Sequence, residues 1–243
     1  ECEKTKIIPL LTYFSSSIGN IRMFFDELIS LIYDNLNTTS DAYSFALETL
    51  GKVSPNLPEY VMIGLFGKAY TTAINSNNWI HKWWTLRMIG KINFTHLSPR
   101  LSTRAFDFIE LAVISKSEKL KQTAKKISVK MIDHCKHEEF KYFIDRFCRK
   151  FDLFDQTTFE SRVSYLSYIF QRIPQNWTIS FIHIATLLTE AIGLIKFSMN
   201  VMREIFIIIG VLSTNLDEPL VLLFAKQAQL IIDPSFREFC GEP

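Results

Sequence analysis

Apolar residues recur along this chain at helical spacing, in segments that short polar turns separate. In residues 118–136, for example, Leu120, Ala124, Ile127 and Met131 fall at positions i, i+4, i+7 and i+11, which is the spacing of a single buried helix face. Lysines occupy much of the remaining surface of this segment. The pattern therefore predicts an amphipathic helix that buries one face.

Other segments are more apolar than this one and alternate with it along the chain. Their stripes are Phe140, Phe143, Phe147 and Phe151; Phe181, Ala185, Leu188 and Ile192; and Val221, Phe224, Ala228 and Ile231. A helix that is covered both by its own partner and by neighbouring helix pairs needs apolar residues on more than one face. The alternation therefore predicts stacked helix pairs, each with a first and a second helix.

A cation stands near the start of each second helix. Lys82, Lys121, Arg162 and Lys196 are separated by 39, 41 and 34 residues. Repeats of the HEAT and armadillo type are roughly 40 to 47 residues long, whereas tetratricopeptide and ankyrin repeats are close to 33 or 34 and carry other signatures. The spacing favours the HEAT type, with a short last interval.

The expected fold is all-α, an α-solenoid of stacked antiparallel helix pairs that forms a HEAT- or armadillo-like superhelix. Prolines 58, 99 and 219 each stand just before an apolar-periodic run, where a missing N–H costs no helical hydrogen bond. No segment is typical of a sheet strand, and we expect residues 1–243 to form a single array of about six pairs. The predicted helices are 3–14, 20–35, 41–53, 59–74, 79–94, 100–115, 118–136, 138–152, 159–172, 178–192, 195–212 and 218–232.

One interval is much shorter than the repeat spacing of about 40 residues. The position of Arg22 predicts the start of a second helix, and Tyr43 stands where the cation of the next second helix is expected, only 21 residues later. Two second helices in direct succession would leave an apolar groove uncovered. We therefore expect a first helix to be missing near residues 34–40, either because the array has a true deletion there or because this sequence omits a segment, and we favour the omission.

Composition excludes several classes of function. The net charge of +2 does not suggest a nucleic-acid binder, and the longest apolar run, residues 205–212, is far shorter than the about 20 residues of a membrane span. One basic patch stands out, made of Lys116, Lys119, Lys121, Lys125, Lys126 and Lys130. It is interpreted as a solvated helix face, with an acidic partner or a phosphorylated peptide as the alternative.

The sequence contains no motif typical of catalysis or metal binding. The four cysteines, Cys2, Cys135, Cys148 and Cys240, form no close pairs and suit a reduced compartment, the cytoplasm and also the nucleus. The run 134–137 contains two histidines and a cysteine, but no second pair completes a zinc site. There is no phosphate loop and no nucleophile elbow. We expect no enzyme, cofactor, metal or small-molecule substrate.

Short motifs resemble those of HEAT repeats. The segment 6–11, with its proline, resembles a first helix, and Ile21-Arg22 and Leu120-Lys121 resemble the start of second helices. Within that class, residues 46–50 followed by Asn78-Trp79-Ile80 are similar to repeats of the scaffold subunit of type-2A serine/threonine phosphatases, as is Ile195-Lys196-Phe197 with Val201. The aspartate usual in the turn of that family is replaced by Asn78 or Glu118, or is missing.

This resemblance implies a non-catalytic scaffold whose turns hold phosphatase catalytic and regulatory subunits along one ridge. Carried over by position, the ridge consists of Asn78, Trp79, Lys82, Glu118, Lys121, Thr158, Arg162 and Lys196. Trp79 is the strongest candidate, because aromatic residues dominate interface energetics. Each residue also has a structural interpretation. A tryptophan can pack on the neighbouring repeat, and a cation can form an ion pair with an acidic turn residue of the next repeat. The alternative function is an adaptor of another class, a nuclear transport receptor or a structural subunit of a large intracellular assembly.

Overall fold

The computed structural model describes residues 25–36, 41–92, 99–134, 137–152, 155–173 and 198–213, with Ile184, Leu187, Leu188 and Ala191. All regular elements within these residues are helices. They are α2 (Phe25–Asn35), α3 (Asp41–Val53), the 3-10 turn η2 (Ser54–Asn56), α4 (Glu59–Asn75), α5 (Trp79–Ile89), α6 (Pro99–Val113), α7 (Glu118–His134), α8 (His137–Cys148), α9 (Gln156–Phe170) and α11 (Met199–Ser213).

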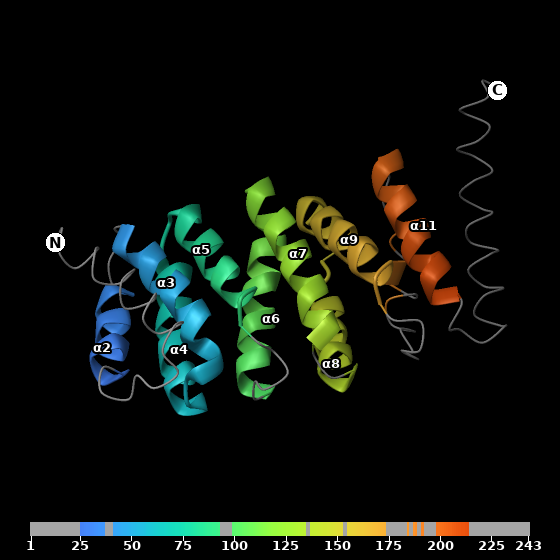
Figure 1. Ribbon diagram of the computed structural model, residues 1–243. Coiled ribbons are helices and arrows are strands. Elements are labelled where there is room, and N and C mark those ends of the chain that lie inside the picture. The colour runs from blue at the N-terminus through green and yellow to red at the C-terminus, as the bar shows by residue number, and fades with distance from the viewer. Residues whose placement is uncertain are drawn as a thin grey trace, which may run out of the picture. The chain divides into compact units, whose positions relative to one another are not determined.

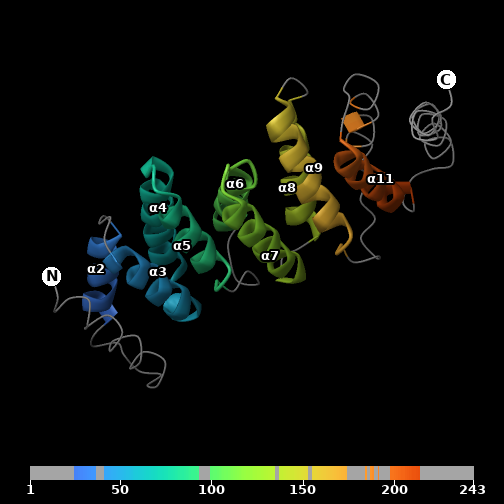
Figure 2. The same cartoon turned by 90° about the horizontal axis from the view of Figure 1, so that it is seen from above.

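The chain divides into two compact units, Glu1–Glu139 and Phe140–Pro243. In the first unit, the pairs α2–α3, α4–α5 and α6–α7 each pack against one another, and α5 lies between α3 and α7. Helix α2 also contacts α4. Helices α3, α5 and α7 therefore form one layer, and α4 and α6 lie on its other side, as Figures 1 and 2 show for this unit. This is the packing of an α-solenoid.

Successive turns inside the pairs of this unit have the same local structure. The Ser76 hydroxyl accepts a hydrogen bond from the N–H of Asn78 at 3.1 Å, and 39 residues later the Ser115 hydroxyl accepts one from the N–H of Ser117, also at 3.1 Å. Asn78 then caps α5 by accepting from the N–H of Ile80 at 3.0 Å. Short polar side chains favour such turns because they replace backbone partners that a helix start lacks. The repeat is therefore visible in hydrogen bonds as well as in sequence.

Glycine lets the second helices approach closely where they end. A Cβ atom at Gly51 in α3 would lie 3.0 Å from the side chain of Lys91, and a Cβ atom at Gly90, 39 residues later, would lie 3.0 Å from Ile127 of α7. Both contacts are tighter than a larger residue tolerates without movement of its neighbour. The contact of Gly90 with Ile127 also places the middle of α7 beside the end of α5.

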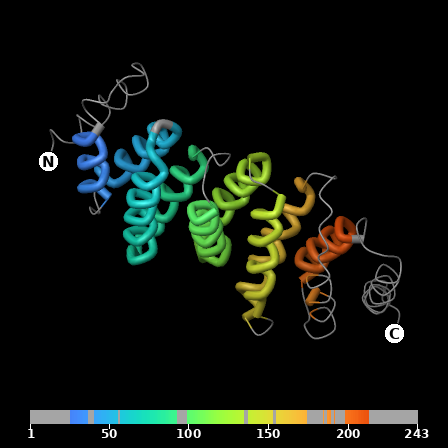
Figure 3. The backbone as a smooth tube through the Cα atoms, turned by 90° about the horizontal axis from the view of Figure 1, so that it is seen from below, coloured from blue at the N-terminus to red at the C-terminus, as the bar shows by residue number. Residues whose placement is uncertain are grey.

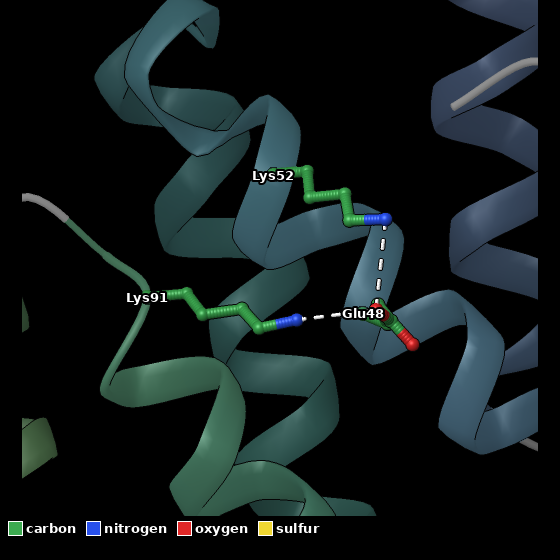
Figure 4. Close-up of polar contacts among 3 residues, drawn as sticks. All are labelled: Glu48, Lys52 and Lys91. Carbon is green, nitrogen blue, oxygen red and sulfur yellow. Dashed lines mark hydrogen bonds and ion pairs between the residues drawn. The ribbon is translucent and has the colours of Figure 1, made fainter. Parts of the chain in front are cut away.

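An ion-pair network covers the contact of α3 with the end of α5. The carboxylate of Glu48 lies 3.5 Å from the Lys52 ammonium and 3.3 Å from the Lys91 ammonium (Figure 4). Partial burial pushes the pKa of Glu48 upward, but the charges and hydrogen bonds of Lys91 and Lys52 outweigh it and hold the pKa below its ordinary value. The network joins two neighbouring repeats at the surface.

The second unit is built around aromatic side chains. In α8, Phe140, Phe143 and Phe147 are buried, and the rings of Phe143 and Phe147 lie 6.5 Å and 5.2 Å from that of Tyr165 in α9. Helix α11 packs along α9, as Figure 3 shows, and Glu204 of α11 accepts a hydrogen bond from the Ser164 hydroxyl at 3.0 Å. Helix α11 thus packs on α9 as α7 packs on α5.

The structure confirms the all-α fold of packed helix pairs. One expectation is wrong: α2, the described part of the predicted helix 20–35, is the first helix of its pair, because it packs against α3 and α4. Its buried residues include Leu28 and Ile32, and Leu36 just after the helix is buried as well. A first helix missing near residues 34–40 and a single array of about six pairs both stay predictions. The predicted helices 3–14 and 218–232 lie outside the described residues.

Within the helices that the structure describes, none is both long and apolar enough to cross a membrane. The same residues contain no group of three or more His, Cys, Asp or Glu side chains placed to hold a metal ion.

Candidate partner-binding surface

Three tryptophans lie on the first two turns of α5. Trp79, at the first position of the helix, is 41% exposed, and Trp83 and Trp84 are half-buried. The rings of Trp83 and Trp84 are 5.0 Å apart and tilted by 60°. Because α5 packs on α3, α4, α6 and α7, these rings occupy the part of its surface that its neighbours leave uncovered.

Two cations lie over these rings. The ammonium of Lys119, from the first turn of α7, lies 5.4 Å from the ring centre of Trp79 and 4.2 Å from that of Trp83. The guanidinium of Arg87 lies 4.9 Å from the ring centre of Trp83 and 4.7 Å from that of Trp84. Each such contact is worth about 0.5 to 1 kcal/mol at an exposed site. We call these five residues, Trp79, Trp83, Trp84, Arg87 and Lys119, the tryptophan–cation cluster.

A buried polar network fixes the helix beneath the cluster. The Tyr43 hydroxyl of α3 donates to the Ala69 carbonyl of α4 at 3.2 Å and lies 2.9 Å from the Thr85 hydroxyl of α5. Thr85 donates to the carbonyl of His81, whose Nδ1 lies 2.7 Å from the Ser76 hydroxyl. The network thus joins three helices to the turn before Trp79. Satisfied buried polar groups of this kind hold one geometry, because breaking any bond strands a desolvated partner.

In the first unit, the structure brings together most of the residues predicted for the ridge. Asn78 caps α5, and Trp79 belongs to the cluster. Lys82 and Lys121 are half-buried in the first turns of α5 and α7. Glu118 is exposed beside Lys119 and accepts a hydrogen bond from the Gln122 amide at 2.8 Å. The turns of two successive repeats therefore meet at this surface.

In the second unit, the predicted residues have structural partners of their own. The Thr158 N–H and hydroxyl donate to the carboxylate of Asp155, at 3.1 Å and 2.6 Å, at the start of α9. Arg162 is only 4% exposed; its guanidinium donates to the Phe147 carbonyl at 3.3 Å and lies 4.7 Å from the ring centre of Phe147. This places the Arg162 side chain inside the unit. Lys196 lies outside the described residues.

Sequence reasoning missed four members of the cluster. It assigned Lys119 to a solvated basic face and gave no role to Trp83, Trp84 or Arg87. A signal was present, since Trp79, Trp83 and Arg87 follow one another at intervals of four and so share a helix face. The contact of Lys119 with these rings has no such local signal, because it joins residues about 40 positions apart.

Comparisons with known proteins give a limited result. No protein-family model matches the chain, and no curated protein matches it. Two crystal structures of engineered proteins are similar, each with 12% sequence identity. One has a TM-score of 0.42, with 77% of this chain and 80% of the engineered chain covered. The other has a TM-score of 0.43, and this chain spans about half of it, with 81% of this chain and 51% of the engineered chain covered.

Proposed function

We propose that this protein is a non-catalytic helical-repeat scaffold that holds a partner protein on the tryptophan–cation cluster of α5 and α7. One observation carries the proposal: three partly exposed tryptophans and an exposed arginine gather on one helix surface that a buried network holds in place. Tryptophan and arginine are the residue types that contribute most at protein interfaces, particularly where a supporting layer holds them in place. Here the buried network of Tyr43, Thr85 and His81 supplies that support.

A phosphatase catalytic subunit is the first partner to test. The resemblance of Asn78-Trp79-Ile80 and its repeat register to type-2A phosphatase scaffolds supports this choice, and Trp79 lies in the cluster. An adaptor of another class is the alternative. The two differ in the identity of the bound protein, because the cluster would serve both.

The test is quantitative capture of partners by the purified chain, followed by mass spectrometry. Trp79→Ala and Arg87→Ala are compared with Tyr60→Ala, which removes an exposed aromatic ring, 77% exposed, from α4. We expect both cluster variants to lose a stoichiometric partner at least about tenfold, because truncation of such anchors typically costs 2 kcal/mol or more. We expect Tyr60→Ala to retain that partner.

Circular dichroism shows whether the variants remain folded. If Trp79→Ala and Arg87→Ala capture the same proteins in the same amounts as Tyr60→Ala, the cluster does not hold a partner. Presence of a phosphatase catalytic subunit among the proteins lost by both variants supports the phosphatase scaffold; its absence supports the other adaptor class.

A further inference from the structure

The surface around the cluster is far more basic than the chain as a whole. Helix α5 contains Lys82 and Arg87 and no Asp or Glu, while α7 contains five lysines against Glu118 and Asp133. Seven positive and two negative side chains leave a surplus of five positive charges on these two helices, whereas all 243 residues together carry +2. The charge is concentrated where α5 and α7 lie side by side.

Three of the lysines continue the cluster along α7. Lys119, Lys126 and Lys130 lie at positions i, i+7 and i+11 and so share one helix face, and all three are exposed. Lys119 contacts the tryptophans at the start of α5, and Ile127, next to Lys126, contacts Gly90 at its end. Helix α7 therefore runs alongside α5, and its exposed lysine face begins at the tryptophans with Lys119.

Neighbouring carboxylates do not neutralise this face. In the part of the chain that the structure describes, no ion pair joins Lys126 or Lys130 to a carboxylate, and the Glu118 side chain binds Gln122. Lys119 lies over aromatic rings, which keeps its charge. An unneutralised row of like charges costs self-repulsion, which a ligand of opposite charge would relieve.

We propose that the α5–α7 surface binds an acidic segment, rich in Asp and Glu, of the partner protein. This deepens the proposed function and rests on it. The eleven steps along the helix from Lys119 to Lys130 span about 17 Å at about 1.5 Å per residue, which about five residues of extended chain would cover. Carboxylates of the segment would pair with Lys126 and Lys130, and an apolar side chain would pack on the exposed edges of Trp79 and Ile80, each 41% exposed.

Geometry favours an acidic peptide over single-stranded nucleic acid, although aromatic and basic residues do alternate here. Base stacking needs open ring faces. Trp83 has Lys119 and Arg87 over its ring and Trp84 beside it, and Trp83 and Trp84 are half-buried. The ring faces are thus largely occupied, while the ammonium groups keep N–H donors for carboxylates.

The test measures binding of a fluorescein-labelled glutamate-rich peptide to the full chain by fluorescence anisotropy. Lys126→Glu together with Lys130→Glu should weaken binding at least about tenfold, because two attractive charges become repulsive. The matched control is Arg100→Glu with Arg203→Glu, which makes the same change in net charge at exposed positions in the first turns of α6 and α11. We expect the control to bind within about twofold of the unaltered chain, and binding to weaken as salt rises.

Further probes can overturn the proposal. A glutamine version of the peptide should not bind. Equal or tighter binding of a phosphoserine peptide or of oligothymidylate would assign the surface to phosphate-bearing ligands. If the control pair loses as much peptide affinity as the Lys126→Glu, Lys130→Glu variant, the effect depends on net charge alone and the proposed surface is wrong. Absence of glutamate-peptide binding at low salt would also reject the proposal.

The capture experiment separates this inference from the proposed function. If the partner is lost by Trp79→Ala but retained by Lys126→Glu with Lys130→Glu, the scaffold function stands and the acidic segment is wrong. If Trp79→Ala and the variant with Lys126→Glu and Lys130→Glu both retain every captured protein, the proposed function itself fails, whether or not the glutamate-rich peptide binds.

Discussion

Cations meet aromatic rings in both units of this protein, with opposite consequences. In the first unit, Arg87 and Lys119 lie over tryptophans at the surface of α5 and α7, and both are exposed. In the second unit, Arg162 of α9 lies against Phe147 and Phe151, 4.7 Å and 5.8 Å from their ring centres, and is buried. The same pairing can therefore form a binding surface or a part of the core.

The difference lies in what else each cation must satisfy. The buried guanidinium of Arg162 donates to the Phe147 carbonyl in the last turn of α8, and the same oxygen accepts from the Lys150 N–H at 3.3 Å. Tyr43, which stands at the corresponding repeat position in α3, likewise donates to a carbonyl, that of Ala69 in α4. Arg87 and Lys119 remain hydrated and can still accept a partner. Tyr43 and Arg162, which share a repeat position, are thus both buried donors, whereas Arg87 and Lys119 stand at other positions and are exposed.

Truncation of Arg162 should produce the largest effect. Arg162→Ala removes packing between two phenylalanines and one of the two hydrogen bonds to the Phe147 carbonyl, the other coming from the Lys150 N–H, so we expect a loss of about 3 kcal/mol in the free energy of unfolding. Arg87→Ala, the matched truncation at the surface, removes two contacts of about 0.5 to 1 kcal/mol each and should cost less, about 1 to 2 kcal/mol. Chemical denaturation followed by circular dichroism measures both. Equal losses would show that the two cations do not differ in the way their burial implies.

The second prediction concerns Tyr43, which shares the buried role. Tyr43→Phe removes its hydroxyl from Thr85 and Ala69 and should cost about 1 to 2 kcal/mol at neutral pH, whereas Tyr60→Phe at an exposed position should be nearly neutral. Denaturation curves of the two variants give this comparison directly. A loss in Tyr43→Phe no larger than in Tyr60→Phe would mean that the network beneath α5 does not stabilise it.

The same hydroxyl should make the stability of the protein depend on alkaline pH. Burial raises the pKa of Tyr43 to about 12, although its hydrogen bond with Thr85 acts in the opposite direction. Since this pKa lies above the ordinary value of 10.0, the folded chain holds the proton more tightly than the unfolded chain. The stabilisation is complete below about pH 10 and is lost as the pH rises toward 12, by up to about 2 to 3 kcal/mol. The free energy of unfolding of Tyr43→Phe, measured by denaturation at pH 10 and at pH 12, should therefore fall less than that of the unaltered chain.

Much of the fold could be predicted from sequence, because local signals specify it. The helix expected at 118–136 is α7, Glu118–His134, and the one expected at 100–115 is α6, Pro99–Val113; periodicity and turn residues sufficed for both. The type of α2 could not be predicted from Arg22, because a cation does not reveal which layer a helix joins. Packing against α4 decides that.

The candidate surface was predictable only in part. Trp79 could be found from its place at the head of α5. The burial of Arg162 could not, because it depends on Phe147 and Phe151, which lie on and just after the preceding helix. Lys119 appeared as one lysine of a basic run, and only the packing of α7 on α5 places it over two tryptophans. Local pattern specifies elements, whereas contacts between repeats specify surfaces.

A smaller effect should follow from loss of the cap that orients Trp79. Asn78→Ala removes the acceptor for the Ile80 N–H and should cost about 1 kcal/mol. Asn77→Ala, one position earlier in the same turn and exposed, should be nearly neutral. Thermal unfolding compares the two variants. Near-ultraviolet circular dichroism reports the tryptophan surroundings, and an unchanged spectrum in Asn78→Ala would show that the cap does not position the cluster.

The smallest effect is expected at the surface network of Glu48. Glu48→Gln removes the ion pairs with Lys52 and Lys91, which are partly exposed, and should cost no more than about 0.5 kcal/mol. Because the pKa of Glu48 is held below its ordinary value, this stabilisation is present above the ordinary pKa and is lost as the pH falls through the lowered one. A double-mutant cycle with Lys91→Gln isolates the pair that joins α3 to the end of α5. A coupling as large as the loss in Arg162→Ala would contradict the comparison, since surface charges would then stabilise the repeats as strongly as the buried arginine does.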